Sequence, residues 1–178
     1  MRIIRGKYGK RRFEVPSGFK ARPTTDFAKE NLFNVLENIF DWDGKSVLDL
    51  FAGTGSIGLE FLSRGCRSVV AVEKDKRHYL FLQKLADTLK DPAYRPILSD
   101  AFRFIESRRG SFDIVFADPP YALDNIEEIP DLLIKHGTVH SGSTIIIEHP
   151  GTISFSSHPC FYSHKVYGSV NFSILFVP

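Results

Sequence analysis

The chain has 178 residues, of which 43% are hydrophobic and 25% are charged, and its formal net charge is +2. This length and composition predict one soluble globular domain, and the lack of an apolar run of about 18 residues argues against a membrane-spanning helix. Cys66 and Cys160 form neither a disulfide framework nor a metal-ligand cluster, so we expect a cytoplasmic protein with reduced thiols and no bound metal.

The first 22 residues carry most of the positive charge. They hold eight basic side chains and one acid, whereas residues 23–178 hold 15 basic and 20 acidic side chains. Hydrophobic residues interleave with these charges around Gly6 and Gly9, which predicts a two-stranded basic β-ribbon over residues 1–22 and one main domain over residues 23–178. A basic ribbon suits a polyanion, although a solvated tail is the usual explanation of a charge run. The candidate polyanion-binding side chains are Arg2, Arg5, Lys7, Lys10, Arg11, Arg12 and Arg22.

An amphipathic helix is predicted next, because apolar residues recur at helical spacing over Phe27–Phe40. Pro23 marks its start, and either Thr24 or Thr25 can serve as its N-cap. The segment Asp41–Gly44 then ends the helix and leads to the most informative part of the sequence.

The segment Ser46–Glu60 has the pattern of a buried strand, a glycine turn and a helix start. Such a turn lets a nucleotide-like ligand lie against bare backbone near free N–H groups. Gly53, Gly55 and Gly58 also fit the G-x-G-x-x-G pattern of dinucleotide-binding proteins. Asp49, at the carboxyl end of the strand, would repel a pyrophosphate but suits the ammonium and sulfonium of S-adenosylmethionine (SAM). A helix cap or turn is the alternative role of Asp49.

Two strands and a helix follow the glycine turn. The strand Ser68–Val72 ends in Glu73, which is placed to hold ribose hydroxyls. The next helix is predicted over Asp75–Leu89, with a buried side formed by Tyr79, Leu80, Leu82 and Leu85. The short strand Pro96–Leu98 leads to Asp100, whose carboxylate can accept a hydrogen bond from an adenine amino group. Capping of the following helix explains Asp100 equally well.

The second half of the chain completes an α/β pattern. Its predicted elements are a strand at Phe112–Ala117, a helix over Ile126–Ile134, a strand at Thr144–Ile147, and a hairpin of Tyr162–Tyr167 and Val170–Val177. We therefore expect a mostly parallel seven-stranded sheet with helices on both faces and an antiparallel C-terminal hairpin. Ligands of such sheets bind outside the carboxyl ends of the strands. Four acidic residues fall at those ends: Asp49, Glu73, Asp100 and Asp118.

The segment Asp118-Pro119-Pro120-Tyr121 follows the fourth strand and has a chemistry of its own. Two prolines stiffen the backbone and leave its carbonyls free to accept. The Asp118 carboxylate and the Pro119 carbonyl can together grip the two hydrogens of an exocyclic amino group. Tyr121 offers an aromatic face for an extruded base, a contact worth about 1–3 kcal/mol. A rigid loop in which Asp118 is a cap is the alternative.

These motifs resemble those of SAM-dependent methyltransferases of the class I (Rossmann-like) fold that carry the DPPY signature of amino-group methylation. More specifically, the chain resembles the bacterial 16S rRNA (guanine-N2) methyltransferase family over nearly its whole length. The matching segments are residues 2–6, 22–26, 47–58, 73–75, 100–101, 118–121 and 165–168. The glycine turn and DPPY are shared with adenine-N6 enzymes, whereas the basic start followed by Arg22-Pro23-Thr24 is more specific to this family.

The resemblance implies methylation of the N2 amine of one guanine in small-subunit (16S) ribosomal RNA, with SAM as cofactor. The implied partner is this RNA or the assembling small subunit, and we expect a monomer. The implied cofactor-binding residues are Thr24, Thr25, Asp49, Phe51, Ala52, Gly53, Thr54, Gly55, Glu73, Lys74, Asp100 and Ala101. Catalysis is assigned to Asp118, Pro119, Pro120 and Tyr121, and RNA binding to the seven basic side chains named above. Phe27 departs from the family, which commonly has a charged residue there.

Three other functions stay open at this point: adenine-N6 methylation of DNA or RNA, a non-catalytic nucleotide- or RNA-binding module, and a dinucleotide oxidoreductase. The chain between Tyr121 and Ser143 is short for the separate target-recognition segment that adenine-N6 enzymes usually carry. A pure binding module has no use for paired acceptors at Asp118.

Overall fold

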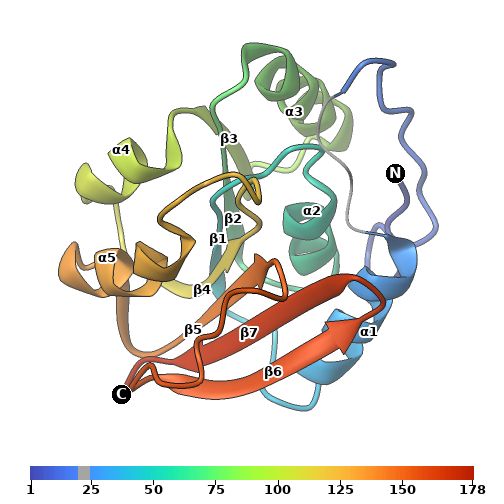
Figure 1. Cartoon of the computed structure of the whole chain (residues 1–178). Helices are drawn as coiled ribbons and strands as arrows, with labels where there is room; N and C mark the ends of the chain where they lie inside the picture. The colour runs from blue at the N-terminus through green and yellow to red at the C-terminus, as the bar shows by residue number, and fades with distance from the viewer. Residues whose placement is uncertain (20–24) are drawn as a thin grey trace.

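The computed structural model describes residues 1–19 and 25–178 (Figure 1). The helices are α1 (Asp26–Leu36), α2 (Ser56–Ser63), α3 (Lys76–Leu89), α4 (Ala101–Glu106), the 3-10 helix η1 (Ile126–Glu128) and α5 (Ile129–Lys135). The strands are β1 (Ser46–Asp49), β2 (Ser68–Glu73), β3 (Tyr94–Leu98), β4 (Phe112–Ala117), β5 (Val139–His149), β6 (Phe161–Tyr167) and β7 (Val170–Phe176). Within the described ranges, no helix combines the length and the apolar character needed to cross a membrane.

The strands form one sheet in the order β3-β2-β1-β4-β5-β7-β6. The first five of these are parallel, and β7 pairs antiparallel with both β5 and β6. This confirms the predicted mostly parallel seven-stranded sheet with an antiparallel C-terminal hairpin. From β1 the chain first adds β2 and β3 on one side and then crosses to add β4 and β5 on the other, so the strand order changes direction between β1 and β4. Proteins of the α/β class bind ligands in the crevice beyond the carboxyl ends of the strands at this point.

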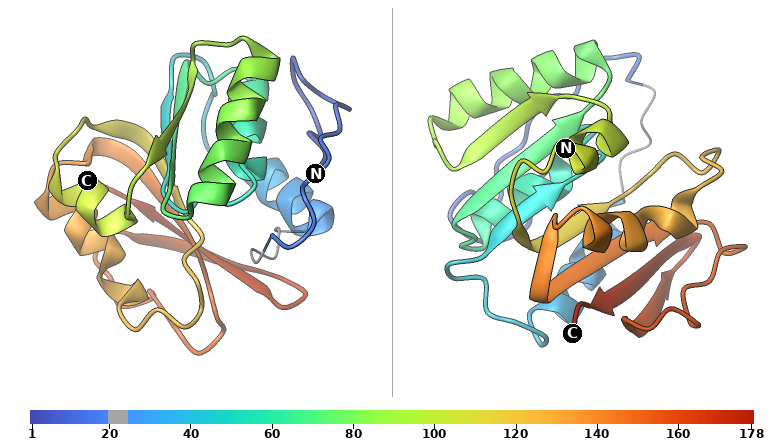
Figure 2. Two further views of the ribbon diagram at one scale, coloured as in Figure 1. Left: turned by 90° about the horizontal axis from the view of Figure 1, so that it is seen from above. Right: turned by 90° about the vertical axis from the view of Figure 1, so that its left-hand side faces the viewer.

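Helices cover both faces of the sheet, as Figure 2 shows in two further views. One core lies between the sheet and the layer of α1, α2 and α3, and includes Leu32, Phe61 and Leu82. A second core lies under α4 and α5 and includes Phe104 and Leu133. The strands between these layers are buried on both sides, which explains their nearly continuous apolar sequences.

Two details of the helices differ from the sequence prediction. Helix α1 ends at Leu36 rather than Phe40, because the N–H groups of Asn38 and Ile39 bond three residues back and tighten the last turn. In α3 the predicted core residue Leu80 is 53% exposed. The buried side of α3 consists of Phe81, Leu82, Leu85 and Leu89, so the apolar face is rotated by about one residue from the predicted one.

The N-terminal segment folds back on itself as a short irregular hairpin: the N–H groups of Ile3 and Phe13 donate to the carbonyls of Arg11 and Met1 at 3.0 and 2.9 Å, and the Lys10 N–H donates to the Ile3 carbonyl at 2.9 Å. A single β-bridge joins Arg2 and Arg12, and no strand is assigned to residues 1–19. The N–H groups of Ile4 and Arg5 instead donate to the buried Glu60 carboxylate on α2, at 2.7 and 3.1 Å. Since these two donors are used on the main domain, the pairing between the two arms does not continue beyond Ile3. The expected ribbon is therefore a short hairpin docked on α2.

Gly6 makes this docking possible. Its φ is +84°, and a Cβ atom there would lie 1.8 Å from the Ser63 carbonyl oxygen, so every other residue type is strained and blocked. The Lys7 N–H donates to the same carbonyl at 2.7 Å. The N-terminal segment therefore turns in direct contact with the Ser63 carbonyl at the C-terminal end of α2.

Lys29 of α1 joins the N-terminal segment to the glycine turn. Its side chain is fully buried, and its Nζ donates to the Arg2 carbonyl at 2.6 Å and to the Ser56 hydroxyl at 2.8 Å. Burial lowers the pKa of Lys29, while the charges of Glu60 and Asp26 oppose that shift. One ammonium thus links three segments that are distant in the sequence.

We predict that Glu60→Ala lowers the free energy of unfolding by about 3 kcal/mol. The substitution leaves the two N–H donors of the segment and the Arg64 Nε, which lies 2.9 Å from Glu60, without their acceptor. Denaturant unfolding measures the loss. Glu106→Ala, at the exposed end of α4, is the control and should change stability by less than about 0.5 kcal/mol. Equal effects of the two variants would contradict the anchoring role of Glu60.

Candidate active site

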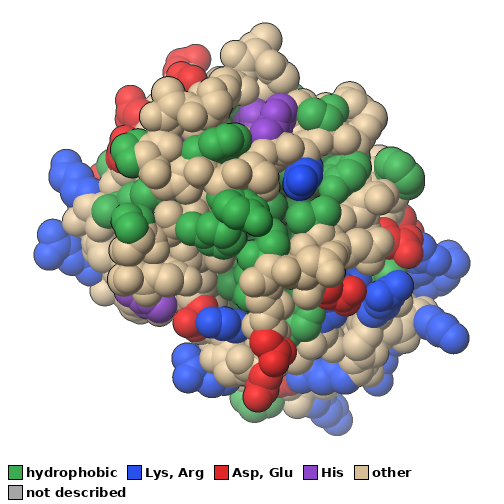
Figure 3. Space-filling model, turned by 90° about the horizontal axis from the view of Figure 1, so that it is seen from below, with side chains coloured by type: hydrophobic (Ala, Val, Ile, Leu, Met, Phe, Trp, Pro, Cys, Tyr) green, Lys and Arg blue, Asp and Glu red, His purple; other side chains and the backbone are tan. Residues whose placement is uncertain are grey.

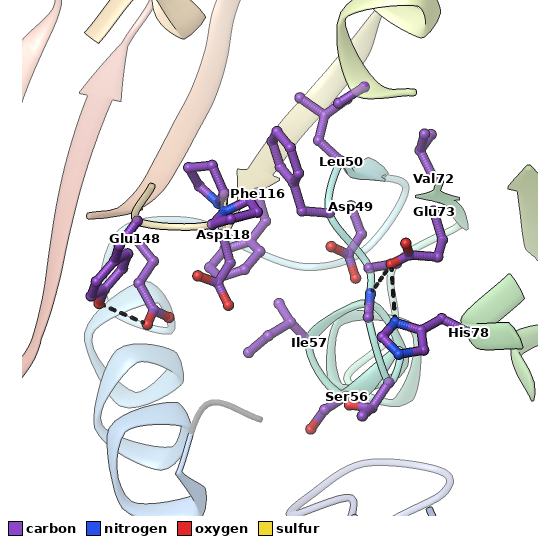
Figure 4. A pocket seen from close by; sticks show the side chains of 18 of the residues that line it. Asp49, Leu50, Ser56, Ile57, Val72, Glu73, His78, Phe116, Asp118 and Glu148 are labelled. Atoms are coloured by element: carbon purple, nitrogen blue, oxygen red, sulfur yellow. Dashed lines mark hydrogen bonds and ion pairs between the residues drawn. The ribbon is translucent and has the colours of Figure 1, made fainter. Parts of the chain in front are cut away.

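A cavity of about 860 Å³ opens beyond the carboxyl ends of the parallel strands. Its walls come from the ends of β1, β2, β4 and β5, the residue before α1, and the turn between β6 and β7. Figure 4 shows that acidic side chains point into this space from several strands. We call four of them the carboxylate row: Asp49, Glu73, Asp118 and Glu148. The size and the lining suit a nucleotide-sized ligand with positive charge.

The pairing of the strands explains the carboxylate row. Asp49 lies beside Ala71 of β2 and Phe116 of β4, and Phe116 lies beside Ile146 of β5. The other three members of the row are two residues beyond these partners. Side chains alternate between the faces of a sheet and neighbours in register point the same way. All four carboxylates therefore project from one face at one edge.

Asp49 is buried, with 1% of its surface exposed. Its Oδ2 accepts the N–H of Gly58 at 3.0 Å, and a Cβ atom on Gly58 would lie 2.9 Å from the same oxygen. Burial raises the pKa of Asp49 to about 7, the Gly58 hydrogen bond opposes this, and the Glu73 charge adds to it. Asp49 lies within β1 and faces the cavity, so it is not a turn residue, and its bond to Gly58 also satisfies one of the free N–H groups in the first turn of α2, as the capping alternative expects.

Glu73 holds the glycine turn in place. One carboxylate oxygen accepts the Gly53 N–H and the other accepts the Asp75 N–H, both at 2.8 Å. The ring of His78 lies 3.8 Å from the first oxygen. A carboxylate has about four acceptor positions, so Glu73 retains capacity for the hydroxyls of a ligand.

The DPPY segment forms the wall opposite the glycine turn. Asp118 lies half-buried, and the pKa of its carboxyl is raised well above its ordinary value by burial and by the charges of Glu148 and Asp49. Tyr121 is 48% exposed, and its hydroxyl donates to Glu148 Oε1 at 3.4 Å. A stiff backbone thus presents a carboxyl and an aromatic ring to the same cavity.

The other predicted cofactor residues divide into three groups. Those that line the cavity are Thr25, Phe51, Ala52, Gly53, Thr54, Lys74 and Ala101. Gly55 precedes α2 with a φ of +73°, and Asp100 caps α4 by accepting the N–H groups of Phe102 and Arg103. Neither of these two lines the cavity, so Asp100 has the capping role that was the alternative. Thr24 and Arg22 lie outside the described residues.

The sequence analysis missed Glu148. This residue is only 6% exposed and follows the apolar run Ile145–Ile147, just as Asp49 and Asp118 follow theirs. The strand was predicted to end at Ile147, so Glu148 shows the same pattern as Asp49 and Asp118, an acidic residue directly after a buried strand. Glu148 was nevertheless not chosen as a site residue. His78 and the turn between β6 and β7 were also missed as lining residues. Among the described residues there is no group of three or more side chains able to hold a metal ion.

The basic side chains of the N-terminal segment fall into two sets. Arg2 and Lys7 lie 3.2 and 2.7 Å from Asp26 and Asp91, and Arg5 pairs with Glu37, so these three help to dock the segment. The other set, which we call the exposed basic set, consists of Lys10, Arg11 and Arg12; Arg5 and Lys7 are also exposed, but their side chains are held in the ion pairs above. In Figure 3, Lys and Arg side chains gather at the edge of the molecule on which the segment and α1 lie in Figure 1.

Comparison with known proteins gives consistent results. The family model Conserved hypothetical protein 95 matches residues 1–176. Ribosomal RNA small subunit methyltransferase D of Escherichia coli K12 is 33% identical over 177 residues, covering 98% of this chain and 88% of the relative. The corresponding protein of Buchnera aphidicola (strain Bp) is 32% identical, covering 86% and 78%. A hypothetical protein of Thermus thermophilus has a solved structure with a TM-score of 0.83, 27% identity and 99% coverage of both chains. The chain therefore belongs to this family of ribosomal RNA methyltransferases.

Proposed function

We propose that this protein transfers a methyl group from SAM to the exocyclic N2 amine of a guanine in small-subunit ribosomal RNA. The relatives in Escherichia coli and Buchnera aphidicola are named small-subunit rRNA methyltransferases, and the cofactor of the chain is SAM. The observation that carries the proposal is that the DPPY segment and the glycine turn face each other across one cavity. A methyl donor and an amine acceptor need this arrangement, because the transfer requires in-line geometry.

Asp49, Glu73 and the glycine turn form the cofactor half of the site. SAM, when bound, supplies a methyl group on a positively charged sulfur. Asp49 in its ionised form attracts the positive groups of this ligand, and Glu73 accepts from its hydroxyls. Neighbouring carboxylates help to raise the pKa values of Asp49 and Asp118 in the free protein, so a cation among them favours the ionised forms of both.

The DPPY segment forms the acceptor half. Asp118 and the Pro119 carbonyl accept the two hydrogens of the amine and orient its lone pair, and the Tyr121 ring stacks on the base. As the N–C bond forms, the bond between sulfur and methyl would break and leave a neutral thioether, and the amine would become an acidic ammonium that releases its proton to solvent water. Most of the rate comes from positioning and electrostatics.

We predict that SAM affinity depends on the ionisation of Asp49. Below about pH 7 its carboxyl is protonated and cannot attract the ligand, so affinity at pH 5.5 should be at least about tenfold weaker than at pH 8. Calorimetry across this range on wild-type protein and on Asp49→Asn is the measurement. The variant should bind weakly at every pH, and a wild-type affinity independent of pH would refute the assignment.

The raised pKa of Asp49 also has a consequence for stability. A carboxyl with a raised folded-state pKa makes the free protein less stable as pH rises from its ordinary 3.8 towards 7. We expect Asp49→Asn to be more stable than the wild type at pH 8, by up to about 4 kcal/mol, while losing the thermal shift that SAM produces. A thermal-shift series at pH 5 to 8, with and without SAM, tests both statements.

We predict that Asp118→Ala lowers kcat by about 10²–10³ and leaves SAM affinity nearly unchanged, since the lost interaction is strongest in the transition state. Single-turnover methylation of small ribosomal subunits with labelled SAM, followed by nucleoside analysis, tests this. N2-methylguanosine supports the proposed reaction, and N6-methyladenosine would support adenine methylation instead. A wild-type rate in Asp118→Ala would make DPPY a structural turn.

The exposed basic set should bind RNA phosphates. Arg11→Ala with Arg12→Ala should weaken RNA binding without changing SAM affinity. The slope of log affinity against log salt concentration should fall by the equivalent of about one to two phosphate contacts. Arg108→Ala with Arg109→Ala, an exposed pair beyond α4, is the matched control. An unchanged salt slope in the N-terminal variant would identify the segment as a purely structural element.

A further inference from the structure

We propose that Glu148 selects guanine over adenine, by accepting the N1–H of the target base while Asp118 and the Pro119 carbonyl hold the neighbouring amine. The inference deepens the proposed function and rests on it. It assigns a specificity-determining role to a residue that lies outside the DPPY segment.

The sheet places Glu148 directly beside Asp118. Ala117 of β4 is paired with Ile147 of β5, so Asp118 and Glu148 are the next neighbours in the same register. Adjacent strands lie about 4.8 Å apart, so carboxyl groups on neighbouring strands can converge on one base edge. Both side chains line the cavity, and Figure 4 shows their carboxylates pointing into it from neighbouring strands.

Glu148 is also held on several sides. Strand β5 pairs with β4 on one edge and with β7 on the other, where Glu148 lies opposite Phe172. The Tyr121 hydroxyl reaches Oε1 at 3.4 Å, which couples the carboxylate to the ring that stacks on the base. A side chain fixed by a central strand and by a neighbour is suited to reading a base edge, because little order is lost on binding.

The chemistry of the two purines distinguishes them at this position. Guanine presents two adjacent donors, N1–H and the N2 amine, whereas adenine presents its N6 amine beside an N1 acceptor. Two adjacent carboxyl groups and a carbonyl match the first pattern. The second pattern sets the N1 lone pair of adenine against the Glu148 carboxylate. A site built to pair with a donor strongly rejects the analogue that lacks it.

The decisive substrate is one that keeps the N2 amine and replaces the N1–H donor by an acceptor. Once the methylated nucleotide has been mapped, RNA can be prepared with guanine, 2-aminopurine or adenine at that position. 2-Aminopurine keeps the N2 amine but has an acceptor at N1. Wild-type protein should methylate the guanine RNA with a kcat/KM about 10- to 100-fold above that for the 2-aminopurine RNA. Equal values would overturn the role of Glu148 without any variant being made.

The variant Glu148→Gln tests the residue itself. Its amide can donate to N1 of 2-aminopurine, so the preference for guanine should fall at least about tenfold, while the thermal shift with SAM stays unchanged. Glu148→Asp keeps a carboxylate and should retain the preference at lower kcat. Glu106→Gln makes the same chemical change on the exposed surface and should alter neither the preference nor the rate.

Failure of the proposed function and failure of the role of Glu148 give different results. If the wild-type protein forms N6-methyladenosine on ribosomal subunits, the proposed function is wrong and the inference fails with it. If the wild type forms N2-methylguanosine but Glu148→Gln keeps the full guanine preference, only the role of Glu148 is wrong.

Discussion

The active site depends on the register of four parallel strands. Because β2, β1, β4 and β5 are aligned, acidic residues that are far apart in the sequence project from one face at one edge of the sheet. Buried like charges are unfavourable in the free protein, which the raised pKa values of Asp49 and Asp118 express. A cation bound among these carboxylates relieves the repulsion. The free energy that the repulsion costs the free protein therefore adds to the binding free energy of a positively charged ligand.

The substrate side of the molecule is tied to the cofactor side through buried polar groups. Glu60 holds the backbone of the N-terminal segment, and Lys29 bonds both to that segment and to Ser56 at the glycine turn. Buried groups of this kind tolerate little rearrangement, since an unmet donor or charge is costly. The exposed basic side chains are therefore carried by a segment with a fixed place on the main domain.

Much of this arrangement follows from sequence pattern. Apolar runs of strand length followed by acids predicted the sheet and three of the four carboxylates, because burial and strand ends leave strong local signals. Glu148 carries the same local signal but lies inside a strand that continues to His149, and Asp100 caps a helix that competes for its oxygens. The N-terminal hairpin is shorter than the predicted ribbon because the Ile4 and Arg5 N–H groups bind Glu60, about 56 residues away, and no local pattern reports such a partner.

The docking of the N-terminal segment also constrains when the chain can reach its final form. Its anchors, Glu60 and Ser63, lie 55 residues or more further along the chain than the groups they bind. During synthesis these first residues leave the ribosome long before α2 exists, and forming such distant contacts carries a loop-closure cost. The part of the protein that emerges first is thus among the last to become ordered, and the surface proposed to bind RNA is completed only on a finished core.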